Sequence, residues 1–167
     1  MALKRIVMHW TAGGNKANSV DLQNYHEIVE GDGTRVLGTL HPEANESTAD
    51  GVYAAHTRAF NSGAIGISMA GMQGAIPKPF NAGAHPISED QVQAFVEAVA
   101  EYAETYDIDI NRENVLTHAE VPITHGKPQP GKWDITWLPG MKKPDDPIKV
   151  GDVLREMAAA ARKKNFG

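Results

Sequence analysis

The chain has 167 residues and a mass of 18.0 kDa, with 41% hydrophobic and 22% charged side chains, which suits one well-buried globular domain and is short for two. Its formal net charge of −5 at pH 7 argues against nucleic acid as a partner, because proteins that bind phosphate backbones usually carry a basic surface. The chain contains no cysteine, which excludes disulfides and cysteine-based metal sites, so His, Asp or Glu would have to hold any metal.

The start of the chain, MALKRIVMHW, does not resemble a secretory signal. Only three apolar residues follow its basic pair before His9, far fewer than the apolar region of such a signal contains. No later stretch approaches the ~20 apolar residues of a membrane span. We therefore expect a soluble chain made in the cytoplasm, without membrane contact and acting as a monomer.

The first part of the chain has the pattern of strands. Residues Leu3 to Trp10 are typical of a buried strand that ends at the glycine pair Gly13-Gly14. Segments 25–30 and 34–40 flank Gly31-Asp32-Gly33, which is the pattern of a β-hairpin. The sequence thus predicts a sheet near the N-terminus.

A further strand is expected at residues 64–69, where Gly66 indicates a close approach by backbone or ligand. It lies between two segments, 41–63 and 71–86, that are rich in small and polar residues and show no lasting period. We expect these segments to be long surface loops, and long ordered loops are often functional.

The clearest helix begins after Ser88. Ser88 and Gln91 have the spacing of a capping box, and Ile87 and Val92 that of a hydrophobic staple. Apolar residues at spacings of three and four then continue to Tyr106, and this stripe predicts a helix that packs on the sheet.

The rest of the chain predicts a short strand at Val115 to His118, a proline-rich irregular segment over 119–147 and a final helix over about 150–163. We find no internal repeat. These elements predict a single α/β domain over residues 1–167, with a mixed β-sheet flanked by helices.

Two predicted strands end in a histidine, His9 and His118, and each is followed by an irregular segment. Strand ends that meet at one edge of a sheet are where α/β folds place their sites, and His is the commonest metal ligand. A third ligand is available at Asp134. Because alternate residues of an extended segment face the same side, Lys132 and Asp134 are expected to point into one cleft.

The order of these residues resembles a known family, the zinc-dependent N-acetylmuramoyl-L-alanine amidases of type 2, which include phage lysozyme-type amidases and peptidoglycan recognition proteins. The resemblance runs from about residue 3 to residue 140. It implies a mixed sheet flanked by helices, one zinc ion in a cleft at the sheet edge, and cleavage of the amide between the muramic acid lactyl group and L-alanine. The segments that carry it are His9 before Thr-Ala-Gly, Tyr25-His26 before Gly31-Asp32-Gly33, His56 before Asn61, Ile65-Gly66-Ile67, His118-Ala119-Glu120 and Lys132-Trp133-Asp134.

Carried over residue by residue, the resemblance implies that His9, His118 and Asp134 hold the zinc ion, which activates a water molecule. It implies that Lys132 stabilises the oxyanion that develops on the scissile carbonyl. Tyr25 matches a tyrosine that positions the water in the phage members, although other branches use a glutamate.

His56 and Asn61 resemble residues that line the substrate groove. Two departures from the family pattern stand out. Glu27 follows Tyr25-His26 where an aromatic or aliphatic residue is common, and Trp133-Asp134-Ile135 replaces the common Thr-Asp-Pro-Gly. The second leaves the Lys-x-Asp spacing intact and puts the loop geometry around Asp134 in question.

Other assignments stay open at the level of sequence. His125 is a rival for the third ligand, and His26 is either a core residue or an exposed one. Glu120 either forms a hydrogen bond with a metal-binding side chain without touching the metal itself, or faces water. The chain has three tryptophans, Trp10, Trp133 and Trp137. They either line a saccharide groove or cover the metal.

The function that follows is a peptidoglycan amidase of the endolysin type, with peptidoglycan or a muropeptide as its substrate. A cytoplasmic muropeptide-recycling enzyme and a delivered effector are alternatives within the same chemistry. A peptidoglycan-binding module of the same fold would not cleave, but such modules typically lack the complete ligand set. A zinc amide hydrolase with another substrate is the remaining alternative.

Overall fold

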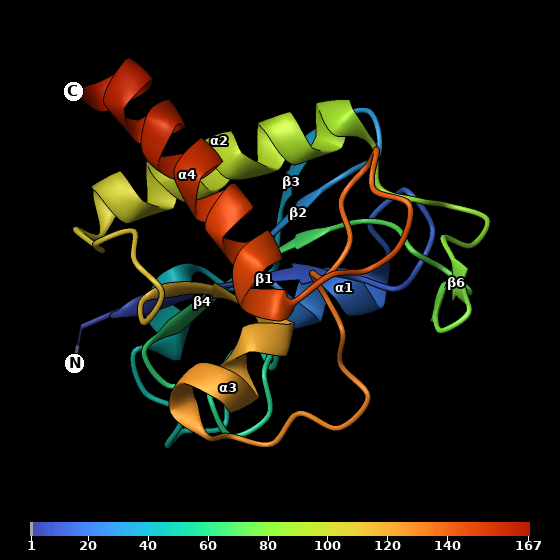
Figure 1. Ribbon diagram of the computed structural model, residues 1–167. Coiled ribbons are helices and arrows are strands. Elements are labelled where there is room, and N and C mark those ends of the chain that lie inside the picture. The colour runs from blue at the N-terminus through green and yellow to red at the C-terminus, as the bar shows by residue number, and fades with distance from the viewer. Residues whose placement is uncertain (1) are drawn as a thin grey trace.

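A central sheet organises the molecule, shown in Figure 1 as a computed structural model in which residues 2–167 are described. Its five strands are β1 (Arg5–Trp10), β2 (Glu27–Val29), β3 (Arg35–Leu37), β4 (Ala64–Met69) and β7 (Val115–Thr117). The strand order is β3-β2-β4-β1-β7, with β3 antiparallel to β2 and every other pair parallel. The sheet is therefore mixed, as the sequence predicts.

The helices and the remaining short elements complete the fold. The α-helices are α1 (Ser19–Asn24), α2 (Glu89–Thr105), α3 (Val121–His125) and α4 (Pro147–Phe166), and none is long and apolar enough to cross a membrane within the described residues 2–167. Two 3-10 helices are present, η1 (Pro42–Asn45) and η2 (His118–Glu120), and β5 (Ile76–Pro77) and β6 (Phe80–Asn81) form a two-stranded ribbon. These segments were expected to be irregular, except for His118, which was expected to end a strand. Elements of two to five residues are too short to show a period in the sequence.

Local sequence explains where the long helices begin. The Ser88 hydroxyl accepts the Gln91 N–H at 3.1 Å, and the Gln91 side chain accepts the Ser88 N–H at 3.2 Å, which confirms the predicted capping box. Helix α4 starts at Pro147, earlier than predicted, because the Asp146 carboxylate accepts the Lys149 N–H and proline is tolerated in the first turn.

The two faces of the sheet are covered differently. Helices α2 and α4 cross one another over one face (Figure 1), where their apolar residues pack with Ile6, Met8 and Trp10 of β1. The opposite face carries a smaller apolar cluster that includes Val7, under α3 and the segment that contains Phe60. Since side chains alternate along a strand, His9 lies on the same face as Val7, away from α2 and α4.

The parallel register brings the two strand-end histidines to one level. Strands β1 and β7 pair through Met8 and Thr117, so the next residues, His9 near the end of β1 and His118 just after β7, both lie at the carboxyl edge of the sheet. This is the edge at which α/β folds place their sites.

Candidate metal centre and active site

Three predicted ligands converge in a buried cluster at this edge. The His9 Nδ1 atom lies 3.1 Å from His118 Nδ1 and 3.2 Å from Asp134 Oδ2, and His118 Nδ1 lies 3.5 Å from Asp134 Oδ1. Ligand atoms bound at about 2.0–2.1 Å to a tetrahedral zinc ion stand roughly 3.3 Å apart. The three donor atoms therefore have the spacing and the chemical type that one zinc ion requires.

Two backbone contacts hold Asp134 at this place. The Trp10 N–H donates to Asp134 Oδ2 at 3.3 Å, and the Ala119 N–H donates to the Asp134 carbonyl at 2.7 Å. The next residue, Ile135, is fully buried in the core, and the peptide bond between the two is cis. The departure from the family pattern after Asp134 thus leaves its carboxylate within the cluster.

The charges in the cluster suit a metal. Burial lowers the pKa of His9 to about 4 despite the nearby Asp134, so its ring is neutral at pH 7. Burial alone would raise the pKa of Asp134, but hydrogen bonds from His118 and His9 outweigh it and hold that pKa well below its usual range. Burial also opposes a charge on His118, but Asp134 outweighs it and raises the pKa of that ring. A metal bound here would take the place of a proton on His118.

The cluster opens to a cleft of about 420 Å³. Tyr25, Lys132 and Asp134 all line it, so the structure brings the two members of the Lys-x-Asp motif to one cleft. The Tyr25 ring centroid lies 5.2 Å from that of His9. Burial and then the charge of Asp134 raise the pKa of Tyr25, so its hydroxyl stays protonated at neutral pH.

The predicted substrate-side residues also line the cleft. His56 is buried, with its ring packed over Gly66, where an added Cβ would lie 2.4 Å from His56 Cγ. This is the close approach that Gly66 indicated. The Asn61 Oδ1 atom accepts the backbone N–H groups of His56 and Thr57 at 3.0 and 2.9 Å. Contact of His56 and Asn61 with a substrate stays a prediction.

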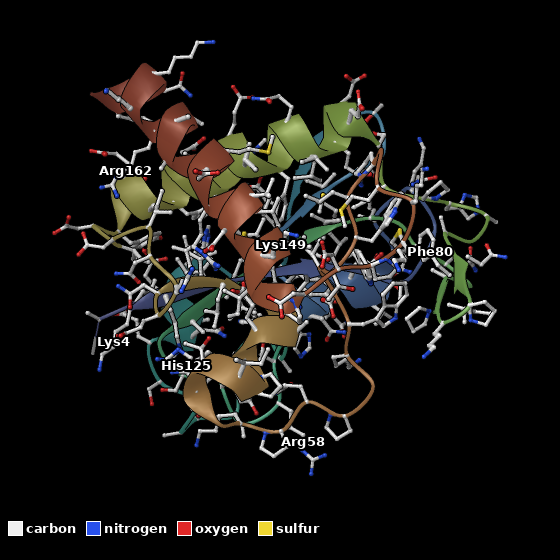
Figure 2. All side chains as sticks on the ribbon, viewed as in Figure 1. Lys4, Arg58, Phe80, His125, Lys149 and Arg162 are labelled. Carbon is white, nitrogen blue, oxygen red and sulfur yellow. The ribbon has the colours of Figure 1, made fainter. Side chains whose placement is uncertain are left out.

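One residue of the site has no signal in the sequence. The Gln129 Oε1 atom lies 2.7 Å from His118 Nε2, and Gln129 Nε2 donates to the Arg58 carbonyl at 2.7 Å. In Figure 2 the Arg58 side chain points away from the sheet. Prolines on both sides of Gln129 favour extended backbone, but nothing in the sequence connects Gln129 with a residue 71 positions away.

The structure places the remaining histidine candidates outside the ligand cluster. His125 Nε2 bonds the Glu113 carbonyl at 2.9 Å, and its ring lies against Phe60, so it is not a third ligand. His26 is a core residue, since its Nδ1 accepts the Gly66 N–H and its Nε2 bonds Asn45 Oδ1, both at 3.0 Å.

The tryptophans divide between the cleft and the core. Trp10 and Trp133 pack edge to face, 4.8 Å apart, and both line the cleft. Trp137 is buried against Phe80 and donates its Nε1–H to the Met141 carbonyl.

The sequence matches the profile of the family described as N-acetylmuramoyl-L-alanine amidase over residues 1–132, which is most of the chain. The chain belongs to this amidase family. The matched region includes His9, Tyr25 and His118 and ends at Lys132, two residues before Asp134. The predicted third ligand, Asp134, therefore lies outside the matched region, and the tertiary structure brings it beside His9 and His118.

Solved structures share the amidase fold at low sequence identity. The amidase AmiD from E. coli, in complex with anhydro-N-acetylmuramic acid-L-Ala-D-gamma-Glu-L-Lys, is 23% identical with a TM-score of 0.50; the match covers 71% of this chain and 49% of that chain. The amidase LysC from Clostridium intestinale is 15% identical, with a TM-score of 0.46 and coverage of 72% and 73%. Drosophila peptidoglycan recognition protein SA is 15% identical, with a TM-score of 0.47 and coverage of 72% and 70%. No curated protein sequence matches the chain.

Proposed function

We propose that this protein is a zinc-dependent peptidoglycan amidase that hydrolyses the amide between N-acetylmuramic acid and L-alanine. One observation carries the proposal. In a chain of the amidase family, His9, His118 and Asp134 bring two ring nitrogens and a carboxylate together at the base of a cleft. These are three protein ligands, the number that leaves one position of a tetrahedral zinc ion open.

The chain's own residues divide the work at the cleft. Zinc, when bound at these three residues, supplies a Lewis acid and lowers the pKa of water toward about 7. The exposed Lys132 side chain adds a positive charge on the same cleft, where the oxyanion of an amide carbonyl would form. Tyr25 keeps its proton at neutral pH, so its hydroxyl can hydrogen-bond the attacking water or the leaving nitrogen but does not serve as a base.

The substrate we propose is intact peptidoglycan, as for an endolysin. Residues at the rim of the cleft are exposed, among them Ala12, Ala55 and Lys132, which leaves the cleft accessible to a polymer. An enzyme that recycles soluble muropeptides is the alternative, and the preferred substrate distinguishes the two.

The test is digestion of purified peptidoglycan and, in parallel, of soluble muropeptide, with zinc and with a chelator. We expect new L-alanine amino termini with zinc only, and faster release from the polymer. Asp134→Ala should abolish both zinc binding and release, whereas Asp32→Ala, at an exposed carboxylate in the hairpin turn, should change neither. Binding of peptidoglycan without release at saturating zinc would leave a recognition module instead.

A further inference from the structure

Both ligand histidines direct their second ring nitrogen at a buried side chain outside the ligand set. His9 Nε2 lies 3.1 Å from His56 Nδ1, and His118 Nε2 lies 2.7 Å from Gln129 Oε1. His56 and Gln129 are both only 6% exposed. At these distances each contact must be a hydrogen bond, so the direction of donation fixes where each ring carries its hydrogen.

The first chain of hydrogen bonds ends on the Ala64 carbonyl. That oxygen lies 3.1 Å from His56 Nε2 and can only accept, so His56 carries its hydrogen on Nε2. In the neutral ring of His56 one nitrogen carries the hydrogen and the other is an acceptor. Its Nδ1 atom therefore has no hydrogen and acts as an acceptor.

The bare Nδ1 atom of His56 determines which nitrogen of His9 carries a hydrogen. Two bare ring nitrogens 3.1 Å apart repel one another unless a cation lies between them, and no ligand group of the described residues faces this pair, so His9 Nε2 donates to His56 Nδ1. The Thr57 hydroxyl, 2.8 Å from His56 Nδ1 and 3.3 Å from His9 Nε2, can join the same bond. With its hydrogen on Nε2, His9 in the neutral form that a metal ligand must take presents a bare Nδ1 to Asp134 and His118.

The second chain ends on the Arg58 carbonyl. Because that oxygen accepts at 2.7 Å, the nearby end of the Gln129 amide is its NH₂ group, and the end that faces His118 is the carbonyl Oε1. His118 therefore carries a hydrogen on Nε2. Its Nδ1 atom, on the side of Asp134, is the atom left for a metal.

The fold makes room for the first of these chains. An added Cβ at Gly66 would lie 2.4 Å from His56 Cγ, so only glycine at this position of β4 admits the His56 ring. The Asn61 side chain holds the backbone on the other side of that ring by accepting the His56 N–H at 3.0 Å. The placement of His56 is thus built into both the strand and the loop.

We propose that His56 and Gln129 are positioning residues, which keep hydrogen on Nε2 of His9 and His118 and so leave both Nδ1 atoms free for one metal ion. The inference rests on the zinc site of the proposed function. It adds a role for His56 besides the predicted contact with substrate, and a role for Gln129, which no sequence pattern marked.

Matched variants test the two positions through zinc affinity, measured by competition with a chelating dye. Gln129→Met keeps the size of the side chain and removes the acceptor, and we expect zinc affinity to fall about 10–100-fold. Gln129→Glu keeps an acceptor for His118 but loses the donor to the Arg58 carbonyl, so its zinc affinity should lie above that of Gln129→Met. His56→Leu should lose affinity as Gln129→Met does, His56→Asn should recover part of it, and His41→Asn, at an exposed loop histidine, should have no effect.

Ring spectra of the parent protein test the arrangement directly. With ¹⁵N-labelled histidine, long-range ¹H–¹⁵N spectra of the zinc-loaded protein should show hydrogen on Nε2 of His9, His56 and His118. Hydrogen on Nδ1 of His56 would overturn the proposal, and so would a Gln129→Met variant that folds and binds zinc as tightly as the parent. These readouts do not use amidase activity. A protein with the expected ring spectra and zinc affinities that cleaves no peptidoglycan would contradict the proposed function alone.

Discussion

At the scale of single residues, Lys132 and Asp134 show how two positions of one short motif serve different purposes. Asp134 is buried and hydrogen-bonded by His9 and Trp10, whereas Lys132 is exposed and lies on the rim of the cleft. The carboxylate belongs to the group of donor atoms, and the ammonium does not. The two side chains should therefore respond differently to substitution.

Lys132→Met should separate catalysis from metal binding. We expect kcat on peptidoglycan to fall about 10²–10³-fold, as on the loss of one oxyanion donor, with zinc affinity unchanged. Lys127→Met, at an exposed lysine of the same segment, is the matched control and should keep the parent kcat. A loss of zinc affinity in step with kcat would instead place Lys132 among the groups that hold the metal.

At the scale of elements, the junction of η2 with α4 explains how the backbone beside His118 is held. Glu120 is fully buried and pairs with Arg155 of α4 through two hydrogen bonds of 2.9 and 2.8 Å. The same carboxylate accepts the Thr117 N–H at 2.9 Å. Of the two roles left open for Glu120, neither holds, since its side chain is fully buried and its carboxylate bonds Thr117 and Arg155. Instead, Glu120 fixes the turn that contains His118 onto helix α4.

Gly151 of α4 allows this junction, because an added Cβ would lie 2.1 Å from Glu120 Oε1. Glycine to alanine in a helix interior normally stabilises by about 1 kcal/mol. Here the methyl group would displace a buried ion pair, so we expect Gly151→Ala to lower the free energy of unfolding by about 1–3 kcal/mol, as overpacking does.

Urea unfolding of the metal-free protein measures this effect. Ala160→Gly, at an exposed position of the same helix, reports the ordinary propensity change and should destabilise by about 1 kcal/mol. A Gly151→Ala variant more stable than the parent would show that Glu120 and Arg155 can shift without cost.

At the scale of the whole molecule, the face of the sheet opposite α2 and α4 contains buried histidines, and burial disfavours the protonated form of His9, His26 and His56. His26 bonds Asn45 and Gly66 and none of the three predicted ligands, and burial lowers its pKa to about 4. In the unfolded chain its pKa returns to about 6.5. Between these values the unfolded chain binds more protons, so the contribution of His26 to stability is complete above about pH 6.5 and is lost as the pH falls toward 4.

His26→Asn should therefore reduce the acid sensitivity of the fold. We expect the difference in unfolding free energy between the parent and this variant to shrink by up to roughly 1.4 kcal/mol per pH unit as the pH falls from 6.5 to 4. Urea titrations with a chelator present remove metal binding from the comparison. The buried His9 and His56 occur in both proteins, so a constant difference across this range would mean that His26 is protonated within the fold.

Much of the fold and site follows from local sequence. The alternation in Ile6 to Trp10 and the capping box at Ser88 are short-range signals, because strand faces and helix starts depend on neighbouring residues. The grouping of His9, His118 and Asp134 could be predicted because a metal requires particular side chains and their order in the chain resembles the family, and the structure brings the three together.

Tertiary structure decided what depends on contacts between distant segments. The ring of His56 over Gly66, the bond from Gln129 to Arg58 and the ion pair of Glu120 with Arg155 each join residues that no local pattern relates. The sequence by itself determined which side chains are available for a metal and which strands carry them. Only the packed fold decided which nitrogen of each histidine faces the metal site, because that choice depends on the acceptor that each ring meets in the buried interior.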